Sequence, residues 1–131
     1  MRSRWMAAAL VIGLSACGGS SSSGSGPTAP PSTGTPPPGP TVTITASGVS
    51  PKQIEITVGG RVTFVNNDNT VHEMASDPHP THENCPPMNE VSVLTPGQFR
   101  QTRVFSSART CGYHDHGQST NTSLQGTIVI R

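Results

Sequence analysis

An alternation of apolar and polar residues along 41–131 is the feature that most restricts how this chain can fold. In "TVTITAS" at 41–47, Val42 and Ile44 are two positions apart, and "QIEITV" at 53–58 repeats the pattern. Successive side chains of a strand point to opposite faces, so a period of two predicts strands with one buried face. The period of an amphipathic helix does not occur in this region.

Further runs of the same kind lie at 61–66, 91–94, 99–105, 110–116 and 126–131. Pro51 and the pair Gly59-Gly60 separate the early runs, as turn residues do. About seven or eight short strands separated by turns predict an all-β sandwich or barrel. Residues 73–90, "EMASDPHPTHENCPPMNE", interrupt the rhythm, and a long irregular insertion in a small β domain is more often functional than decorative.

The N-terminal segment has a different character and predicts export from the cytoplasm. Arg2 and Arg4 precede an apolar run that is too short to span a bilayer, which indicates a signal peptide over 1–16. The sequence "LSAC" at 14–17 resembles the bacterial lipobox, in which cleavage precedes the cysteine and lipid is attached to it. We therefore expect lipidation of Cys17 and a membrane-anchored protein in the periplasm or on the cell surface. The alternative is an ordinary signal peptide in which Cys17 is incidental.

Residues 18–40 consist mainly of Gly, Ser and Pro, with no charged and no large apolar residue. Nothing in such a segment offsets the conformational entropy lost on ordering. We expect 17–40 to form a lipid anchor followed by a disordered tether, and 41–131 to form one folded domain.

Charge and motifs exclude several functions for this domain. Arg2 and Arg4 are two of the eight basic residues, so 8 − 2 = 6 remain in 41–131, against seven acidic ones. There is no basic stripe, which argues against nucleic acid as a partner. No Ser-His-Asp arrangement, phosphate-binding loop or recognisable carboxylate pair is present, so we do not expect an enzyme.

Histidine content points instead to a metal. All five histidines lie in the domain, at His72, His79, His82, His114 and His116. In "TCGYHDHG" at 110–117 the last two are two apart, so on a strand they share a face and can hold one ion. His79 lies between two prolines, which limit the entropy lost when it binds a metal. A cluster of imidazoles suits copper first and zinc next.

Two long stretches carry a resemblance to the cupredoxin, or blue-copper, family. "SGVSPKQIEITVGGRVTFVNNDNTVHEM" at 47–74 resembles the first half of such a domain, and "SLQGTIVIR" at 123–131 resembles its last loop and strand. The resemblance covers nearly all of 41–131. It implies a Greek-key β-sandwich or barrel of the cupredoxin type, with His72 at the position of the family's first copper ligand.

Blue-copper members also use a cysteine, a second histidine and usually a methionine. One alignment makes Cys111 the thiolate ligand and His114 the second histidine. The other puts Asp115 in the cysteine position, and then Gln118 and Leu124 replace the histidine and the methionine. The family often has a short spacing between its cysteine and its methionine. Leu124 follows Asp115 by nine residues and Cys111 by thirteen, so spacing favours the second alignment.

The second alignment leaves Cys85 and Cys111 free to pair. A disulfide between them would pin the proline-rich insertion to a core strand, and an extracytoplasmic location permits it. The alternative use of Cys111 is as a copper ligand. "GYHDHG" also resembles a stretch of multicopper oxidases, but those enzymes assemble their cluster between domains, so we do not expect an oxidase here.

These observations predict a lipid-anchored extracytoplasmic protein that binds copper through its histidines. Its role would be copper holding or delivery, or electron transfer, with a redox or copper-handling protein as partner. One alternative is a blue-copper electron carrier that uses His72, Cys111 and His114. Another is a metal-free scaffold or adhesion domain that keeps only the fold.

Overall fold

The computed structural model describes residues 31–131. The expected signal peptide at 1–16, the lipidation site Cys17 and the first part of the expected tether lie outside these residues. Within the described part of the chain, no helix is long and apolar enough to cross a membrane.

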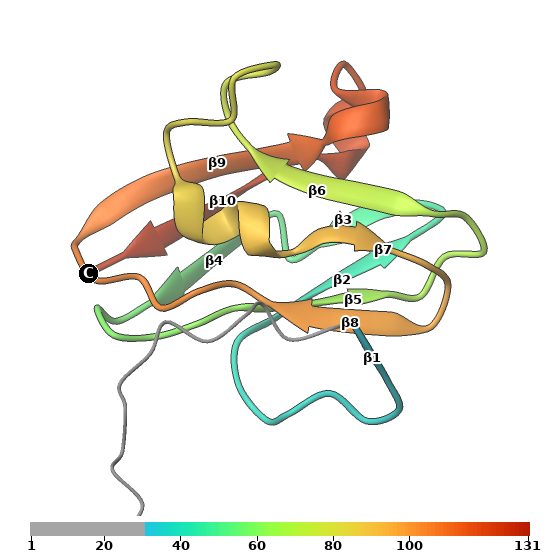
Figure 1. Cartoon of the computed structure of the whole chain (residues 1–131), viewed down its shortest axis with the longest axis horizontal. Helices are drawn as coiled ribbons and strands as arrows, with labels where there is room; N and C mark the ends of the chain where they lie inside the picture. Colours follow the sequence, from blue (N-terminus) through green and yellow to red (C-terminus); the bar gives the residue numbers. More distant parts are fainter. Residues whose placement is uncertain (1–30) are drawn as a thin grey trace, which may run out of the picture.

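The alternating pattern builds two five-stranded sheets that pack face to face (Figure 1). The first sheet has the order β1 (Ser32–Thr33), β8 (Gln98–Gln101), β5 (Thr63–Asn66), β2 (Thr41–Thr45) and β3 (Gly48–Ser50). The second has the order β4 (Gln53–Ile56), β10 (Gly126–Ile130), β9 (Arg109–Asp115), β6 (His72–Ser76) and β7 (Ser92–Leu94). Each sheet is mixed, because β2 pairs with β5, and β4 with β10, in parallel.

The core lies between the sheets and is formed by the apolar half of each alternation. Val42 and Ile44 of β2 are fully buried, as is Ile128 of β10. The rings of Phe64 and Tyr113 meet edge to face across the two sheets, with centroids 5.1 Å apart. This contact is one of the places where the two predicted faces interlock.

The all-β prediction is confirmed, and the residues described here form ten strands because β1, β3 and β6 lie outside the predicted runs. β1 falls within the segment expected to be a tether and pairs with Phe99 and Gln98 of β8. Three 3₁₀ turns complete the part of the chain that the structure describes: η1 (Pro86–Glu90), η2 (His116–Gln118) and η3 (Thr122–Leu124).

The irregular insertion expected at 73–90 is shorter than predicted, because its first residues belong to β6. The inward positions of this strand include polar residues, His72 and Ser76, beside Met74, and all three are buried. The buried polar residues hide the period of two from a hydrophobicity pattern. What remains irregular is the segment 77–85, which we call the histidine loop.

Candidate metal centre

β9 presents different chemistry on its two faces. Cys111, Tyr113 and Asp115 are buried toward the interior, as the alternation predicts. His114 lies between the last two and contacts the histidine loop instead, through a hydrogen bond to Asp77. The strand ends at Asp115, so His116 is the first residue of η2 and not the last of β9.

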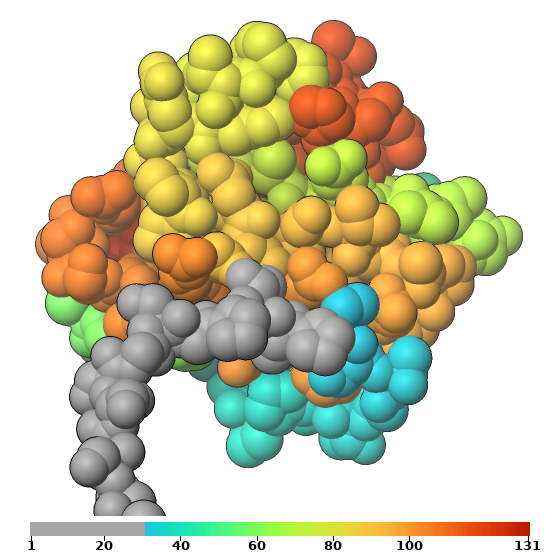
Figure 2. Space-filling view, in the orientation of Figure 1, coloured from blue at the N-terminus to red at the C-terminus, as the bar shows by residue number. Residues whose placement is uncertain are grey.

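The histidine loop brings its own two histidines to those of β9 and η2. One ring nitrogen from each side chain lies within 4.8 Å of the others, in a group formed by His79, His82, His114 and His116. We call this group the four-histidine cluster. In Figure 2 the segment after β6 and the segment after β9 lie side by side at one end of the molecule, as the ring contacts require.

His114 has the environment of a metal ligand. Its Nδ1 donates to Oδ1 of Asp77 at 2.6 Å, and its Nε2 is buried with no hydrogen-bond partner. A carboxylate that accepts from one ring nitrogen leaves the other with its lone pair, which is the usual arrangement around metal-bound histidine. A buried acceptor without a hydrogen-bond partner costs folding free energy, and a metal ion bound to Nε2 would supply the missing partner.

Asp77 reaches this position because Gly112 leaves room for it. A Cβ on Gly112 would overlap the Asp77 carboxylate. The backbone N–H of Asp77 also donates to the Gly112 carbonyl at 3.0 Å, so the start of the histidine loop lies directly on β9. Gly112, the third residue of "TCGYHDHG", is therefore required by the contact that orients His114.

The ring nitrogens of His82 and His116 are spaced as two ligands of one ion. His82 Nε2 and His116 Nδ1 are 3.2 Å apart. Two nitrogens at bonding distance from one tetrahedral ion lie about 3.3 Å apart. Burial, followed by the nearby rings of His114, His116 and His79, lowers the pKa of His82 and favours its neutral form, which is the form that binds metals.

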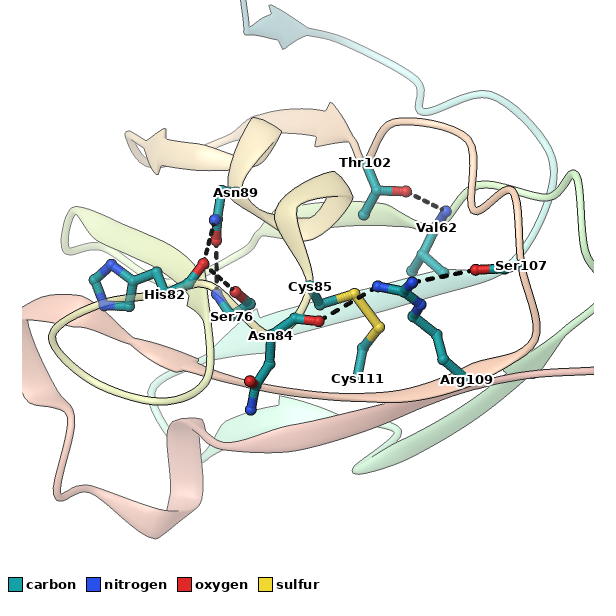
Figure 3. Close-up of a disulfide and its surroundings, with 10 residues drawn as sticks. All are labelled: Val62, Ser76, His82, Asn84, Cys85, Asn89, Thr102, Ser107, Arg109 and Cys111. Atoms are coloured by element: carbon teal, nitrogen blue, oxygen red, sulfur yellow. Dashed lines mark hydrogen bonds between the residues drawn. A yellow bond between two sulfur atoms is a disulfide. The ribbon is translucent and has the colours of Figure 1, made fainter.

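The backbone of His82 is held in the left-handed conformation, with φ of +52°, which few residues other than glycine adopt. Its carbonyl accepts hydrogen bonds from Ser76 Oγ at 2.8 Å and from Asn89 Nδ2 at 2.7 Å (Figure 3). Asn89 in turn accepts from the Ser76 backbone N–H. Left-handed backbone at a non-glycine residue persists where its surroundings impose it, and here they orient a candidate ligand. Asn89 was not predicted from the sequence, because no local pattern marks its role.

A disulfide joins the two halves of the cluster (Figure 3). Cys85 and Cys111 are bonded, with Cα atoms 5.7 Å apart, and both are completely buried. Cys85 follows His82 by three residues, and Cys111 precedes His114 by three. The predicted pairing is confirmed, and in this structure the Cys111 sulfur offers no thiolate to a metal.

His72 lies apart from the cluster. It is buried on the inward face of β6, with Nδ1 2.7 Å from Oδ2 of Asp115 and Nε2 3.1 Å from Oδ2 of Asp68. Hydrogen bonds from His72 and from the Asn69 N–H lower the pKa of Asp68. We call His72, Asp115 and Asp68 the inner triad, in which each ring nitrogen of the histidine faces a carboxylate.

Of the residues that the second alignment placed in ligand positions, Asp115 belongs to the inner triad and Gln118 contacts it. Asp115 contacts His72 directly, and its Oδ1 accepts from the Gln118 N–H at 3.1 Å, which caps η2. Leu124 is buried in the core. Asp115 therefore anchors the backbone between His114 and His116 from the side opposite the cluster.

Comparison with known proteins identifies the fold. No family model and no curated protein sequence matches the chain. Among solved structures, a Cu(I) form of an amicyanin mutant is 18% identical, with a TM-score of 0.57 over 77% of this chain and 91% of that one. A purple cupredoxin from Nitrosopumilus maritimus is 21% identical, with a TM-score of 0.53 over 71% and 100% of the two chains.

A plastocyanin from Dryopteris crassirhizoma is also similar, at 16% identity and a TM-score of 0.55 over 70% of this chain and 99% of that one. The chain spans nearly the whole length of these proteins. The described residues thus have the cupredoxin β-sandwich fold, as the resemblance implied. At these identities the comparisons establish the fold, and the function has to come from the site.

Proposed function

We propose that this protein binds copper outside the cytoplasm through the four-histidine cluster and holds it as cargo for delivery. The observation that carries the proposal is the His114 ring, whose buried, unpartnered Nε2 belongs to a group of four converging imidazoles. Imidazole donors favour Cu(II) over other divalent ions of its row.

The donor set supports holding and delivery more than blue-copper electron transfer. A blue-copper centre needs a thiolate ligand, and both cysteines of the domain are joined in the disulfide. The inner triad has a carboxylate beside His72 where the resemblance expects the thiolate. The cluster also lies at the surface, with His79 exposed, so a partner can approach the ion directly.

The proposal includes the location. The signal sequence and Cys17 would anchor the domain to a membrane by lipid, and the tether would let it reach a copper-handling partner. The proposed disulfide-bonded site requires an oxidising compartment, which the periplasm or the cell surface provides.

The test uses the full chain, purified from an oxidising compartment and loaded with Cu(II). We would record visible absorption and EPR spectra, determine the copper content and count free thiols, with His114→Gln as the matched variant. A pale protein with nitrogen-type EPR features and no free thiol from the domain, together with loss of copper in His114→Gln, is the expected result.

Two other results would point elsewhere. An intense blue band together with free domain thiols would make Cys111 a ligand and electron transfer the function. Wild-type protein that retains neither copper nor zinc would favour a scaffold domain. Zinc competition on the same sample identifies the preferred metal.

A further inference from the structure

The members of the four-histidine cluster are not held equally. His114 is buried and fixed by Asp77. His82 is fixed through its backbone, and its ring lies 3.2 Å from that of His116. His79 is exposed, and within the described part of the chain its ring contacts the other three histidines but forms no hydrogen bond.

We propose that His79 is the exchange ligand, the one that leaves first when copper is handed to an acceptor. The inference rests on the proposed function and adds the route by which the ion leaves. The acceptor is a protein or peptide that presents its own imidazole, the donor that suits Cu(II). It approaches from the exposed side of the cluster, where His79 lies.

Release through one side chain fits the construction of the loop. Pro78 and Pro80 restrict the backbone on both sides of His79, so the ring leaves by rotation about its side-chain bonds and the loop stays in place. The other three histidines keep the ion while this happens. One bond from copper to His79 breaks, one bond from copper to the acceptor nitrogen forms, and the oxidation state of the ion does not change.

The opposite order would be harder to achieve. His114 is buried beneath the loop, and its Nδ1 is bonded to Asp77. The ring of His82 is half-buried and its Nε2 lies 3.2 Å from Nδ1 of His116, so it has less room to rotate away than the exposed ring of His79. Exposure and the hydrogen bond from His114 to Asp77 therefore indicate that His79 leaves first.

The test compares His79→Asn with His82→Asn in the full-length, Cu(II)-loaded protein. Asparagine is used in both because it tolerates the positive φ at position 82. We would measure Cu(II) affinity by competition and the rate of copper transfer to EDTA and to a histidine-rich peptide. Circular dichroism and thiol counting confirm that each variant is folded with its disulfide intact.

We expect His79→Asn to lower the affinity by about tenfold, a change of 1.4 kcal/mol, and to speed transfer to the peptide. His82→Asn should lower the affinity further. In the wild type, the carbethoxylation reagent diethylpyrocarbonate should modify His79 before the other three even with copper bound, as read by mass spectrometry.

Equal loss of affinity in the two variants, or unchanged transfer in His79→Asn, would show that His79 has no special role. Protection of His79 equal to that of His114 would count against it too. These results leave copper binding itself intact, whereas a wild-type protein that retains no copper defeats the proposed function before the exchange step is reached.

Discussion

The sheet formed by β6 and β9 carries histidines in opposite states on its two faces. On the inner face, both ring nitrogens of His72 are within hydrogen-bonding distance of carboxylates, at 2.7 and 3.1 Å. On the other face, His114 has one carboxylate partner and one buried nitrogen with none. Both ring nitrogens of the inner histidine face groups of the protein, and the outer histidine has one ring nitrogen left for a further partner.

The difference shows that a histidine at the expected position of the fold does not necessarily have a ring nitrogen available to bind a metal. His72 occupies the place where the resemblance expects a copper ligand, yet its nitrogens face Asp115 and Asp68. The four-histidine cluster lies where a proline-rich loop covers the strand end, and it has the geometry of a metal site. Substitutions at the two sites, at the disulfide and at Asp77 and Asp68 test this contrast.

His114→Gln and His72→Ala should separate the two sites. We expect His114→Gln to lose copper, because the only buried, unpartnered ring nitrogen among the described histidines is removed. His72→Ala should keep copper but lower the free energy of unfolding by about 3 kcal/mol, since Oδ2 of Asp115 is left buried without a partner. Copper content by mass spectrometry and urea denaturation measure the two effects. Loss of copper in both variants would remove the contrast.

Replacing both Cys85 and Cys111 by serine should affect the cluster more than the inner triad. Removing the cross-link should lower the free energy of unfolding by about 2–4 kcal/mol. Copper affinity should also fall, because the loop with His79 and His82 is no longer tied to β9. Equilibrium denaturation and copper competition measure both quantities. An unchanged affinity would show that the backbone hydrogen bonds alone hold the loop.

Asp77→Asn should weaken copper binding without unfolding the protein. Loss of the carboxylate that orients a ligand histidine typically costs about 10–100-fold in metal affinity. Glu83→Gln, an exposed acidic residue of the same loop, is the control for net charge. If the two variants bind copper equally, the 2.6 Å contact to His114 has no role in binding.

The smallest effect concerns acid stability at the inner triad. The pKa of Asp68 is lower in the folded protein than its ordinary value, chiefly because of the hydrogen bond with His72. Its contribution to stability is therefore fully present above a pH of about 4 and is lost as the pH falls through the lower folded-state value. Asp68→Asn should flatten this acid limb in the metal-free protein. Urea midpoints measured between about pH 2.5 and 6 would show the change. Parallel pH profiles of the wild type and Asp68→Asn would contradict this role of Asp68.

Much of the fold could be predicted from local patterns. The period of two located most of the strands, and the composition of the stretch before residue 41 separated it from the alternating region. β6 was missed because His72 and Ser76 take inward positions that a hydrophobicity pattern does not count as buried. The pairing of Cys85 with Cys111 was expected from the family alignment, since spacing alone does not reveal which strand a loop will reach.

For the candidate site, the sequence indicated which residues could be ligands but not which of them come together. All five histidines were predicted as ligands, and four converge while His72 does not. Asn89, which clamps the carbonyl of His82, lies in a proline-rich turn with no local signal. Such roles depend on where a loop crosses a strand, and that path is set by contacts between residues distant in the chain.

By itself, the sequence determined that apolar and polar residues alternate along 41–131 and that the available metal donors are imidazoles. It also determined that the side chains of His114 and Asp115 point to opposite faces of a strand. These are local consequences of strand geometry and residue type. Only the tertiary structure decided which histidines meet, which one faces two carboxylates, and which one stays exposed. Those outcomes rest on the register of β6 against β9 and on the disulfide that brings the histidine loop to the strand, both of which are long-range contacts.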